Sequence, residues 1–99
     1  MAKRKIIWSS RAKSDLLNIL DYYIQRNGTK SYSLKLNANL RRSVRLLENH
    51  PEIGVQTDVE NVRNLIHGDY AIFYEIKQKS IEIIMSWDCR QDPERLQIK

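Results

Sequence analysis

The feature that most constrains the fold is an alternation of apolar side chains in the last third of the chain. Every second residue of one run is large and apolar, namely Tyr70, Ile72, Tyr74 and Ile76. A second run repeats the pattern with Ile81, Ile83, Met85 and Trp87, which are expected on one face. A period of two is typical of a β-strand with two distinct faces. A shorter run, Val62–Ile66, precedes them, and turn-forming residues separate the runs. The region therefore predicts a three-stranded antiparallel meander.

The N-terminal half has the periodicity of helices instead. Apolar residues recur at spacings of three and four, at Ala12, Leu16, Ile19, Leu20, Tyr23 and Ile24. Ser9 or Ser10 can cap the start of this helix, and Asn27-Gly28 ends it, because glycine accepts the left-handed conformation of a C-terminal cap. The apolar run before the helix, Ile6-Ile7-Trp8, is expected to be an edge strand of the same sheet.

A second helix follows after a short loop. Its apolar stripe is Tyr32, Leu36, Leu40, Val44 and Leu47. Thr29 or Ser31 is expected to cap it, and Pro51 ends it, because proline disfavours helical geometry in the preceding residue. The short loop predicts an antiparallel helix hairpin. A last helical turn is expected to begin at Asp92-Pro93.

Together these elements predict an α+β fold in the order β-α-α-β-β-β, in a single domain spanning residues 1–99. The helix hairpin is expected to pack on one face of a small antiparallel sheet. The other face is expected to remain open to water or to a partner.

Charge and cysteine content indicate which partners and which cellular compartment to expect. Seventeen Lys and Arg against twelve Asp and Glu give a net charge of +5, which favours a polyanionic partner or serves only solubility. Lone Cys89, the lack of a signal-peptide core and the lack of any apolar run near ~20 residues predict a cytoplasmic protein without membrane contact. No metal-ligand spacing or cofactor motif is visible.

Four basic residues are candidates for nucleic-acid binding because they lie on the outer side of the second helix: Lys35, Arg41, Arg42 and Arg45. A phosphate backbone would be neutralised by such a face. The alternative is an ordinary solvated helix face.

The chain resembles the RelE/ParE superfamily of toxins, the poison halves of type II toxin–antitoxin (plasmid-stabilisation) pairs. The resemblance begins at Trp8-Ser9 and continues through Asp15-Leu16, Pro51 and Gly54. It is densest in the pattern formed by Arg63, Leu65, Gly68, Tyr70, Ile72, Tyr74 and Ile76, and it ends at Arg90, Asp92 and Pro93.

The resemblance implies a compact toxin that a cognate antitoxin neutralises in a hetero-oligomeric complex. RelE-like members cut messenger RNA on the ribosome, whereas ParE-like members poison DNA gyrase and cut nothing. Cleavage of mRNA is the first functional hypothesis for this chain, and gyrase inhibition is the alternative. A third hypothesis, based on charge alone, is a non-toxic basic nucleic-acid-binding module.

An endoribonuclease of this kind needs a base, an acid and cations for the phosphorane. Arg90 matches the family arginine at the end of the last strand, where it would bind phosphate or pair with Asp88 or Asp92. Asp88 could act as the base, but the ordinary pKa of an aspartate is low for that role. The alternative, in which the Asp88 carboxylate orients Arg90, fits this low pKa better.

The remaining candidates are less specific. Arg63 would bind phosphate or pair with Glu75 or Glu82 across the sheet. His67, in the expected turn before Gly68, would act as acid or base or be solvated, and Gln91 would complete the set.

The set is incomplete, because Ala71 stands where RelE-like toxins have a catalytic arginine. An alanine side chain can neither bind nor stabilise a phosphoryl oxygen.

Overall fold

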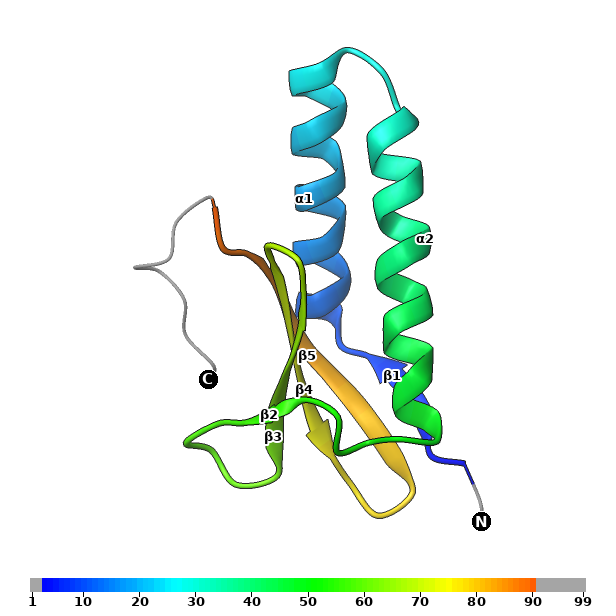
Figure 1. Cartoon of the computed structure of the whole chain (residues 1–99), viewed down its shortest axis with the longest axis vertical. Helices are drawn as coiled ribbons and strands as arrows, with labels where there is room; N and C mark the ends of the chain where they lie inside the picture. Colours follow the sequence, from blue (N-terminus) through cyan, green and yellow to red (C-terminus); the bar gives the residue numbers. More distant parts are fainter. Residues whose placement is uncertain (1–2, 91–99) are drawn as a thin grey trace.

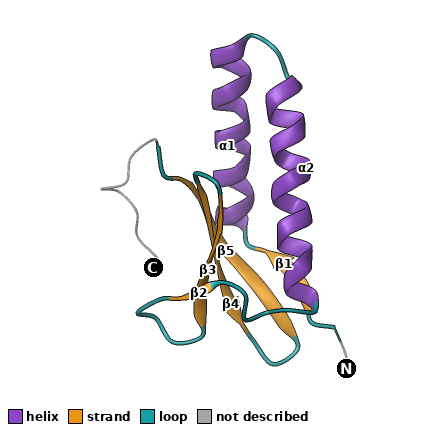
Figure 2. Cartoon of the chain, in the orientation of Figure 1, coloured by secondary structure: helices purple, strands orange, loops and turns teal. Residues whose placement is uncertain are grey.

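The structure, a computed structural model, describes residues 3–90, in which a helix hairpin stands on one face of a twisted sheet (Figures 1 and 2). The helical elements are α1 (Ser10–Asn27), α2 (Ser31–Arg45) and the 3-10 helix η1 (Leu46–Glu48). The strands are β1 (Lys5–Trp8), β2 (Val55–Gln56), β3 (Val62–His67), β4 (Tyr70–Ile76) and β5 (Ser80–Asp88). The predicted α+β class and the order of its elements are confirmed. The last helical turn expected from Asp92-Pro93 onward and the role of Gln91 lie outside the described residues.

The sheet has the strand order β1-β5-β4-β3-β2, and its centre is the predicted antiparallel meander. The edge strand expected at residues 6–8 is present as β1, but it runs parallel to β5, with Ile6 opposite Ile81. The sheet is therefore mostly rather than wholly antiparallel. The two-residue strand β2, which the sequence did not predict, pairs with β3 at the other edge.

Both ends of α1 are capped as the sequence predicts. The Ser9 side chain accepts a hydrogen bond from the Ala12 amide at 3.0 Å. At the other end Gly28 has a φ of 73°, and its amide donates to the Ile24 carbonyl at 2.9 Å. Positive φ is readily accessible to glycine, and the helix therefore stops there.

The start of α2 differs from the prediction. Its N-cap is Lys30 and makes no side-chain cap hydrogen bond, so neither Thr29 nor Ser31 occupies that position. Close by, α2 contacts α1, because the buried Ser33 hydroxyl donates to the Leu20 carbonyl at 2.7 Å. The hairpin is thus joined by a hydrogen bond between its helices near the connecting loop.

The main core lies between the hairpin and the sheet. Buried side chains of both helices meet those of β3, β4 and β5, including Leu16, Ile19, Leu40, Val44, Leu65, Ile72, Tyr74, Ile81 and Ile83. Tyr32 belongs to the predicted stripe of α2 but is 39% exposed. The hydrophobic effect that favours this packing scales with the apolar area removed from water.

A β-bulge corrects the predicted faces of β5. Phe73 pairs with Met85 while Tyr74 pairs with Ile83, which leaves Ile84 as an extra residue. A bulge of this kind shifts the alternation by one residue. Ile81 and Ile83 therefore face the helices, whereas Met85 packs with Phe73 in a second cluster.

The second cluster also corrects the expectation that one sheet face is open. Ala71, Phe73 and Met85 lie away from the main core, and they are 2%, 3% and 0% exposed. Trp87 and Ile84 pack against them. The sheet therefore has buried apolar residues on both faces.

Within residues 3–90, no helix is both long enough and apolar enough to cross a membrane.

Candidate functional site

The end of β5 carries a carboxylate that the fold encloses completely. The Asp88 side chain is 0% exposed. One of its oxygens accepts from the Tyr23 hydroxyl at 2.7 Å, and the other accepts from the Arg90 amide at 2.9 Å and from Arg90 Nε at 3.3 Å. Buried charge is tolerated when hydrogen bonds and an opposite charge satisfy it in this way. The pairing of Arg90 with Asp88 that the sequence offered as one alternative is present.

Arg90 also joins the sheet to both helices. Its Nη2 donates to the Tyr70 hydroxyl at 2.6 Å and to the Tyr23 hydroxyl, and Tyr70 in turn hydrogen-bonds the Tyr32 hydroxyl at 2.7 Å. The Arg90 Nε lies 3.6 Å from a carboxylate oxygen of Asp69 in the β3–β4 turn. These contacts hold the guanidinium in one place.

We call Tyr23, Tyr32, Tyr70, Asp88 and Arg90 the strand-end cluster. Burial is the main cause that raises the pKa of Tyr70 and of Tyr23 above the ordinary tyrosine value, and the bond to Asp88 raises the pKa of Tyr23 further. Both hydroxyls therefore stay protonated near neutral pH. Tyr23 donates its hydroxyl hydrogen to Asp88, whereas Tyr70 accepts from Arg90 and shares a hydrogen bond with Tyr32.

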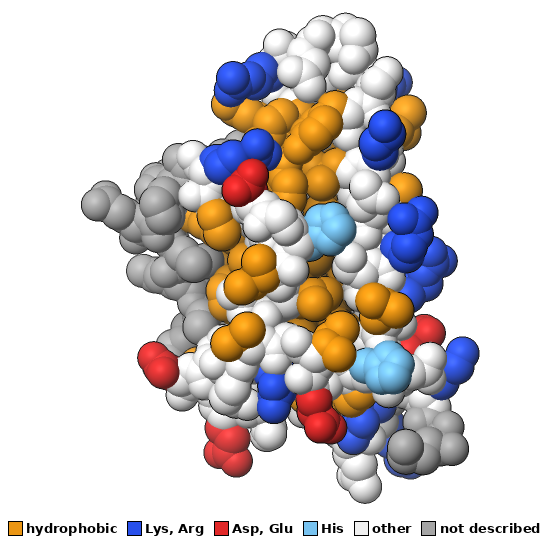
Figure 3. Space-filling model, in the orientation of Figure 1, with side chains coloured by type: hydrophobic (Ala, Val, Ile, Leu, Met, Phe, Trp, Pro, Cys, Tyr) orange, Lys and Arg blue, Asp and Glu red, His pale blue; other side chains and the backbone are white. Residues whose placement is uncertain are grey.

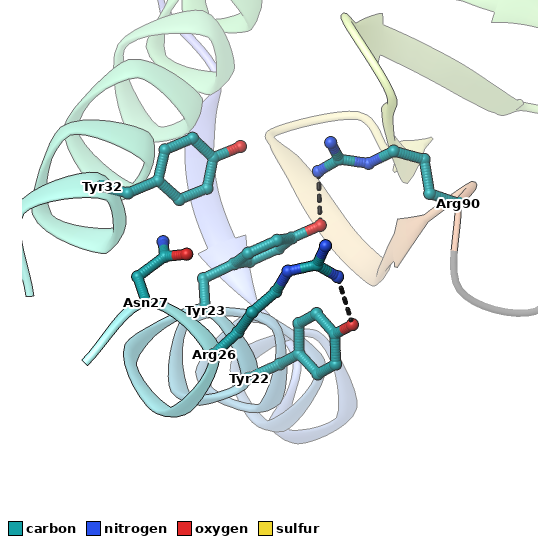
Figure 4. A pocket seen from close by; sticks show the side chains of 6 residues that line it. All are labelled: Tyr22, Tyr23, Arg26, Asn27, Tyr32 and Arg90. Atoms are coloured by element: carbon teal, nitrogen blue, oxygen red, sulfur yellow. Dashed lines mark hydrogen bonds between the residues drawn. The ribbon is translucent and has the colours of Figure 1, made fainter. Parts of the chain in front are cut away.

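A hollow of about 660 Å³ opens beside this cluster and is lined by Tyr22, Tyr23, Arg26, Asn27, Tyr32 and Arg90. Four of these residues come from the last two turns of α1, one comes from the start of α2, and Arg90 lies two residues after the end of β5 (Figure 4). Arg26 Nη1 donates to the Tyr22 hydroxyl at 3.1 Å. The hollow thus combines two guanidinium groups with three phenol rings.

Arg63 is placed away from this hollow. Its Nη1 donates to the carbonyls of Gly54 at 2.7 Å and of Glu52 at 3.2 Å. Tyr74 holds the same loop, because its hydroxyl donates to the Pro51 carbonyl at 2.7 Å and accepts from the Gly54 amide at 2.9 Å. Arg63 therefore anchors the loop after η1 to the sheet, and the pairing with Glu75 or Glu82 that the sequence offered as one alternative is not the contact it makes.

His67 and Ala71 complete the comparison with the expected nuclease set. His67 is the last residue of β3 rather than a turn residue, and its Nδ1 lies 3.1 Å from the Ser43 hydroxyl of α2. Ala71 is buried in the cluster on the opposite sheet face from Tyr70. The structure therefore brings Asp88 and Arg90 together and binds Arg63 and His67 to other partners.

The four basic residues of α2 are all exposed. Arg41 donates to Asn37 at 3.0 Å and lies 5.1 Å from the centre of the Trp8 ring, and Arg42 donates to Asn39 at 3.1 Å. Figure 3 shows Lys and Arg side chains along the outer edge of this helix. No group of three or more His, Cys, Asp or Glu within residues 3–90 is arranged to hold a metal ion.

The tyrosines and Arg26 were not among the residues that the sequence singled out for function. Arg26 follows Tyr23 by three residues and Tyr22 by four, and this helical spacing places it beside both. Their meeting with Tyr32 and Arg90 depends on how the hairpin docks on the sheet, which periodicity alone does not reveal.

Comparison with known proteins agrees with this architecture. Residues 6–93 match the family described as the ParE toxin of the type II toxin-antitoxin system, parDE. A solved structure of the chromosomal ParDE TA system from P. aeruginosa has a chain that is 24% identical, with a TM-score of 0.75, over 85% of this chain and 94% of that chain. This likeness shows the fold.

A second structure, the E. coli DinJ-YafQ toxin-antitoxin complex, is 16% identical with a TM-score of 0.48, over 87% of this chain and 92% of that chain. No curated protein sequence matches the chain. The family match spans most of the chain, from β1 through the strand-end cluster. The chain therefore belongs to the ParE toxin family of type II toxin–antitoxin systems.

Proposed function

We propose that this chain arrests growth by binding DNA gyrase, and that it does so without cutting RNA. Family membership supports the ParE-type target over the ribosome. The observation that carries the proposal is the state of Asp88 and Arg90. The carboxylate is 0% exposed and bonded to Tyr23 and Arg90.

Ribonuclease chemistry would require these groups to behave differently. A general base must reach the 2′-hydroxyl proton, and a cation must reach the developing phosphorane charge. Asp88 lies behind Tyr23 and Arg90, and Arg63 and His67 are bonded to Gly54 and Ser43 instead. These contacts favour a role for the strand end in binding rather than in catalysis.

The position after Tyr70 supports the same proposal. Ala71 is 2% exposed and belongs to the cluster on the far side of the sheet from Tyr70. A side chain there points away from the hollow, and an alanine supplies no charge. The arginine that contacts Tyr70 is Arg90, whose Nη2 donates to the Tyr70 hydroxyl at 2.6 Å and which is also bonded to Asp88.

We further propose that the partner in the cell is a cognate antitoxin and that the two form a hetero-oligomer. The net charge of +5 suits an acidic partner, because complementary charge steers association. The open reading frames beside the gene would encode the antitoxin.

Two assays on the purified chain test the proposed function. Plasmid supercoiling by purified gyrase is expected to fall as the chain is added. In a cell-free translation system, the mapped 5′ ends of messenger RNA are expected to stay unchanged. New internal 5′ ends together with undisturbed supercoiling would favour ribosome-dependent mRNA cleavage and overturn the proposal.

A further inference from the structure

The hollow beside the strand-end cluster carries positive charge that its own lining does not balance. None of its six lining residues is acidic. Arg26 is exposed and donates to the neutral Tyr22 hydroxyl at 3.1 Å. Among the ion pairs formed within residues 3–90, none involves Arg26. A guanidinium in this state presents donors to any anion that enters.

The opposite wall of the hollow is rigid. Arg90 is held by Asp88, Tyr23 and Tyr70, yet 45% of its side chain remains exposed. Figure 4 shows Tyr23 between the two guanidinium groups, with Arg26 approaching from α1 and Arg90 from the end of β5. A binding group that is already fixed loses little entropy when a ligand arrives.

The size and the ring geometry indicate which anion fits. A volume of about 660 Å³ lies within the range of about 300–1,000 Å³ that is typical of ligand sites. Tyr22 meets Tyr23 edge to face with ring centres 4.9 Å apart, and Tyr23 meets Tyr32 in the same way at 5.0 Å. Neither ring pair is parallel, so neither forms a slot that would hold a nucleobase between two rings. A carboxylate with its short aliphatic stem matches the lining better.

We propose that the hollow receives an Asp or Glu carboxylate from a partner polypeptide, with Arg26 as its main charged contact and Arg90 as the fixed wall. The identity of that partner as the antitoxin rests on the proposed function. The chemistry of the site does not, because it follows from the charge and shape of the hollow alone.

The proposal can be tested by NMR on the full-length chain. The Nε–Hε signal of Arg26 is followed while acetyl-Leu-Glu-Phe-amide is added, and then acetyl-Leu-Gln-Phe-amide in a parallel titration. The glutamate peptide is expected to bind about ten-fold more tightly, because a charged acceptor strengthens the hydrogen bonds from a guanidinium. Adenosine 5′-monophosphate, added in a third titration, is expected to bind more weakly than the glutamate peptide.

Matched variants complete the test. Arg26→Gln is expected to lose about ten-fold in affinity for the glutamate peptide, whereas Arg42→Gln on the exposed face of α2 is expected to bind it normally. The amide spectrum of each variant reports whether it is folded. Equal binding of the two peptides, unchanged binding by Arg26→Gln, or tighter binding of the nucleotide would each overturn the proposal.

The outcome is separable from that of the gyrase assay, because the titration contains neither gyrase nor antitoxin. Peptide binding combined with undisturbed supercoiling would leave the site in place and remove the proposed target. Inhibition of supercoiling without peptide binding would support gyrase as the target and remove the proposed carboxylate site.

Discussion

Asp88 shows how a single residue can serve the fold where a family resemblance suggests chemistry. Its carboxylate accepts from Tyr23 and twice from Arg90 while it is shielded from water. In an asparagine at this position, the amide nitrogen is a hydrogen-bond donor and would face the donor groups of Tyr23 or Arg90. Asp88 therefore links the end of β5 to α1 through its hydrogen bond with Tyr23.

Asp88→Asn is therefore expected to lower the free energy of unfolding by about 2 kcal/mol, the typical value of hydrogen bonds to a charged group. Urea denaturation followed by circular dichroism measures the change. The control is Asp69→Asn, whose side chain is 60% exposed and 3.6 Å from Arg90, and which should cost below about 1 kcal/mol. Equal losses in the two variants would contradict a structural role for Asp88.

The buried tyrosines predict a dependence on alkaline pH. Burial raises the pKa of Tyr70 and Tyr23 in the folded state, whereas unfolded tyrosine ionises near about pH 10. Their contribution to stability is fully present below that pH and is lost as pH rises toward the folded-state values. Urea midpoints measured from pH 8 to 11 should fall above about pH 10, and Tyr70→Phe should make the fall shallower. An equally steep fall in the variant would rule out Tyr70 as a source.

Gly54 gives a further prediction at the scale of one residue. A Cβ atom at this position would lie 2.5 Å from Tyr74 Oη and 2.8 Å from its Cε1. Gly54→Ala is therefore expected to destabilise the protein by about 1–3 kcal/mol, as overpacking does. In a Tyr74→Phe background the same substitution should cost less, because the nearest atom is gone. The two costs, compared by urea denaturation, would be equal if the clash were absent.

At the scale of elements, α1 is docked on the bulge of β5. The Ser9 hydroxyl accepts from the Ala12 amide and donates to the carbonyl of Ile84, the extra residue of the bulge, at 2.9 Å. The Ser9 amide donates to the Ile83 carbonyl at 3.0 Å, and Asp15 accepts from the Ser86 amide at 3.2 Å. One serine thus satisfies both a helix start and an irregular strand.

Ser9→Ala should therefore cost more than the loss of an ordinary cap. It leaves both the Ala12 amide and the Ile84 carbonyl without this partner, and we expect a loss of about 2 kcal/mol. Ser10→Ala, at the exposed first position of α1, should change stability by less than about 0.5 kcal/mol. Thermal unfolding of both variants measures the difference, and similar melting temperatures would contradict the double role of Ser9.

The sequence predicted those elements whose signal is local. Alternation in β4 and the stripes of α1 and α2 are periodic, and Gly28 marks a helix end by its backbone preference. The bulge at Ile84 could not be predicted, because its neighbours in the strand are also apolar. An extra apolar residue in such a run looks like any other residue of the strand. Lys30 at the start of α2 was not predicted, because it makes no side-chain cap hydrogen bond and lysine is not a typical capping residue.

The candidate site was less predictable than the fold. Arg90 and Asp88 are two residues apart, and their pairing was one of the alternatives that the sequence offered. Arg63 instead reaches the carbonyls of a loop nine and eleven residues earlier in the chain. Arg26 and Tyr32 meet Arg90 only when the hairpin lies on the sheet, which requires the tertiary structure.

At the scale of the whole molecule, the hairpin extends past the sheet along a long axis of 44 Å (Figure 1). The hollow lies where the last turns of α1, the start of α2 and the end of β5 come together. None of the four basic residues of α2 is among the residues that line it. The two surfaces that we consider for binding thus lie on the exterior, while Asp88, Arg63 and His67 are hydrogen-bonded to other parts of the chain.

The most direct test of this account is the activity of purified DNA gyrase on relaxed plasmid in the presence of the folded chain. The account predicts that supercoiling falls with increasing chain and that chain unfolded by heat has no effect. Full supercoiling at a large molar excess of folded chain would contradict it.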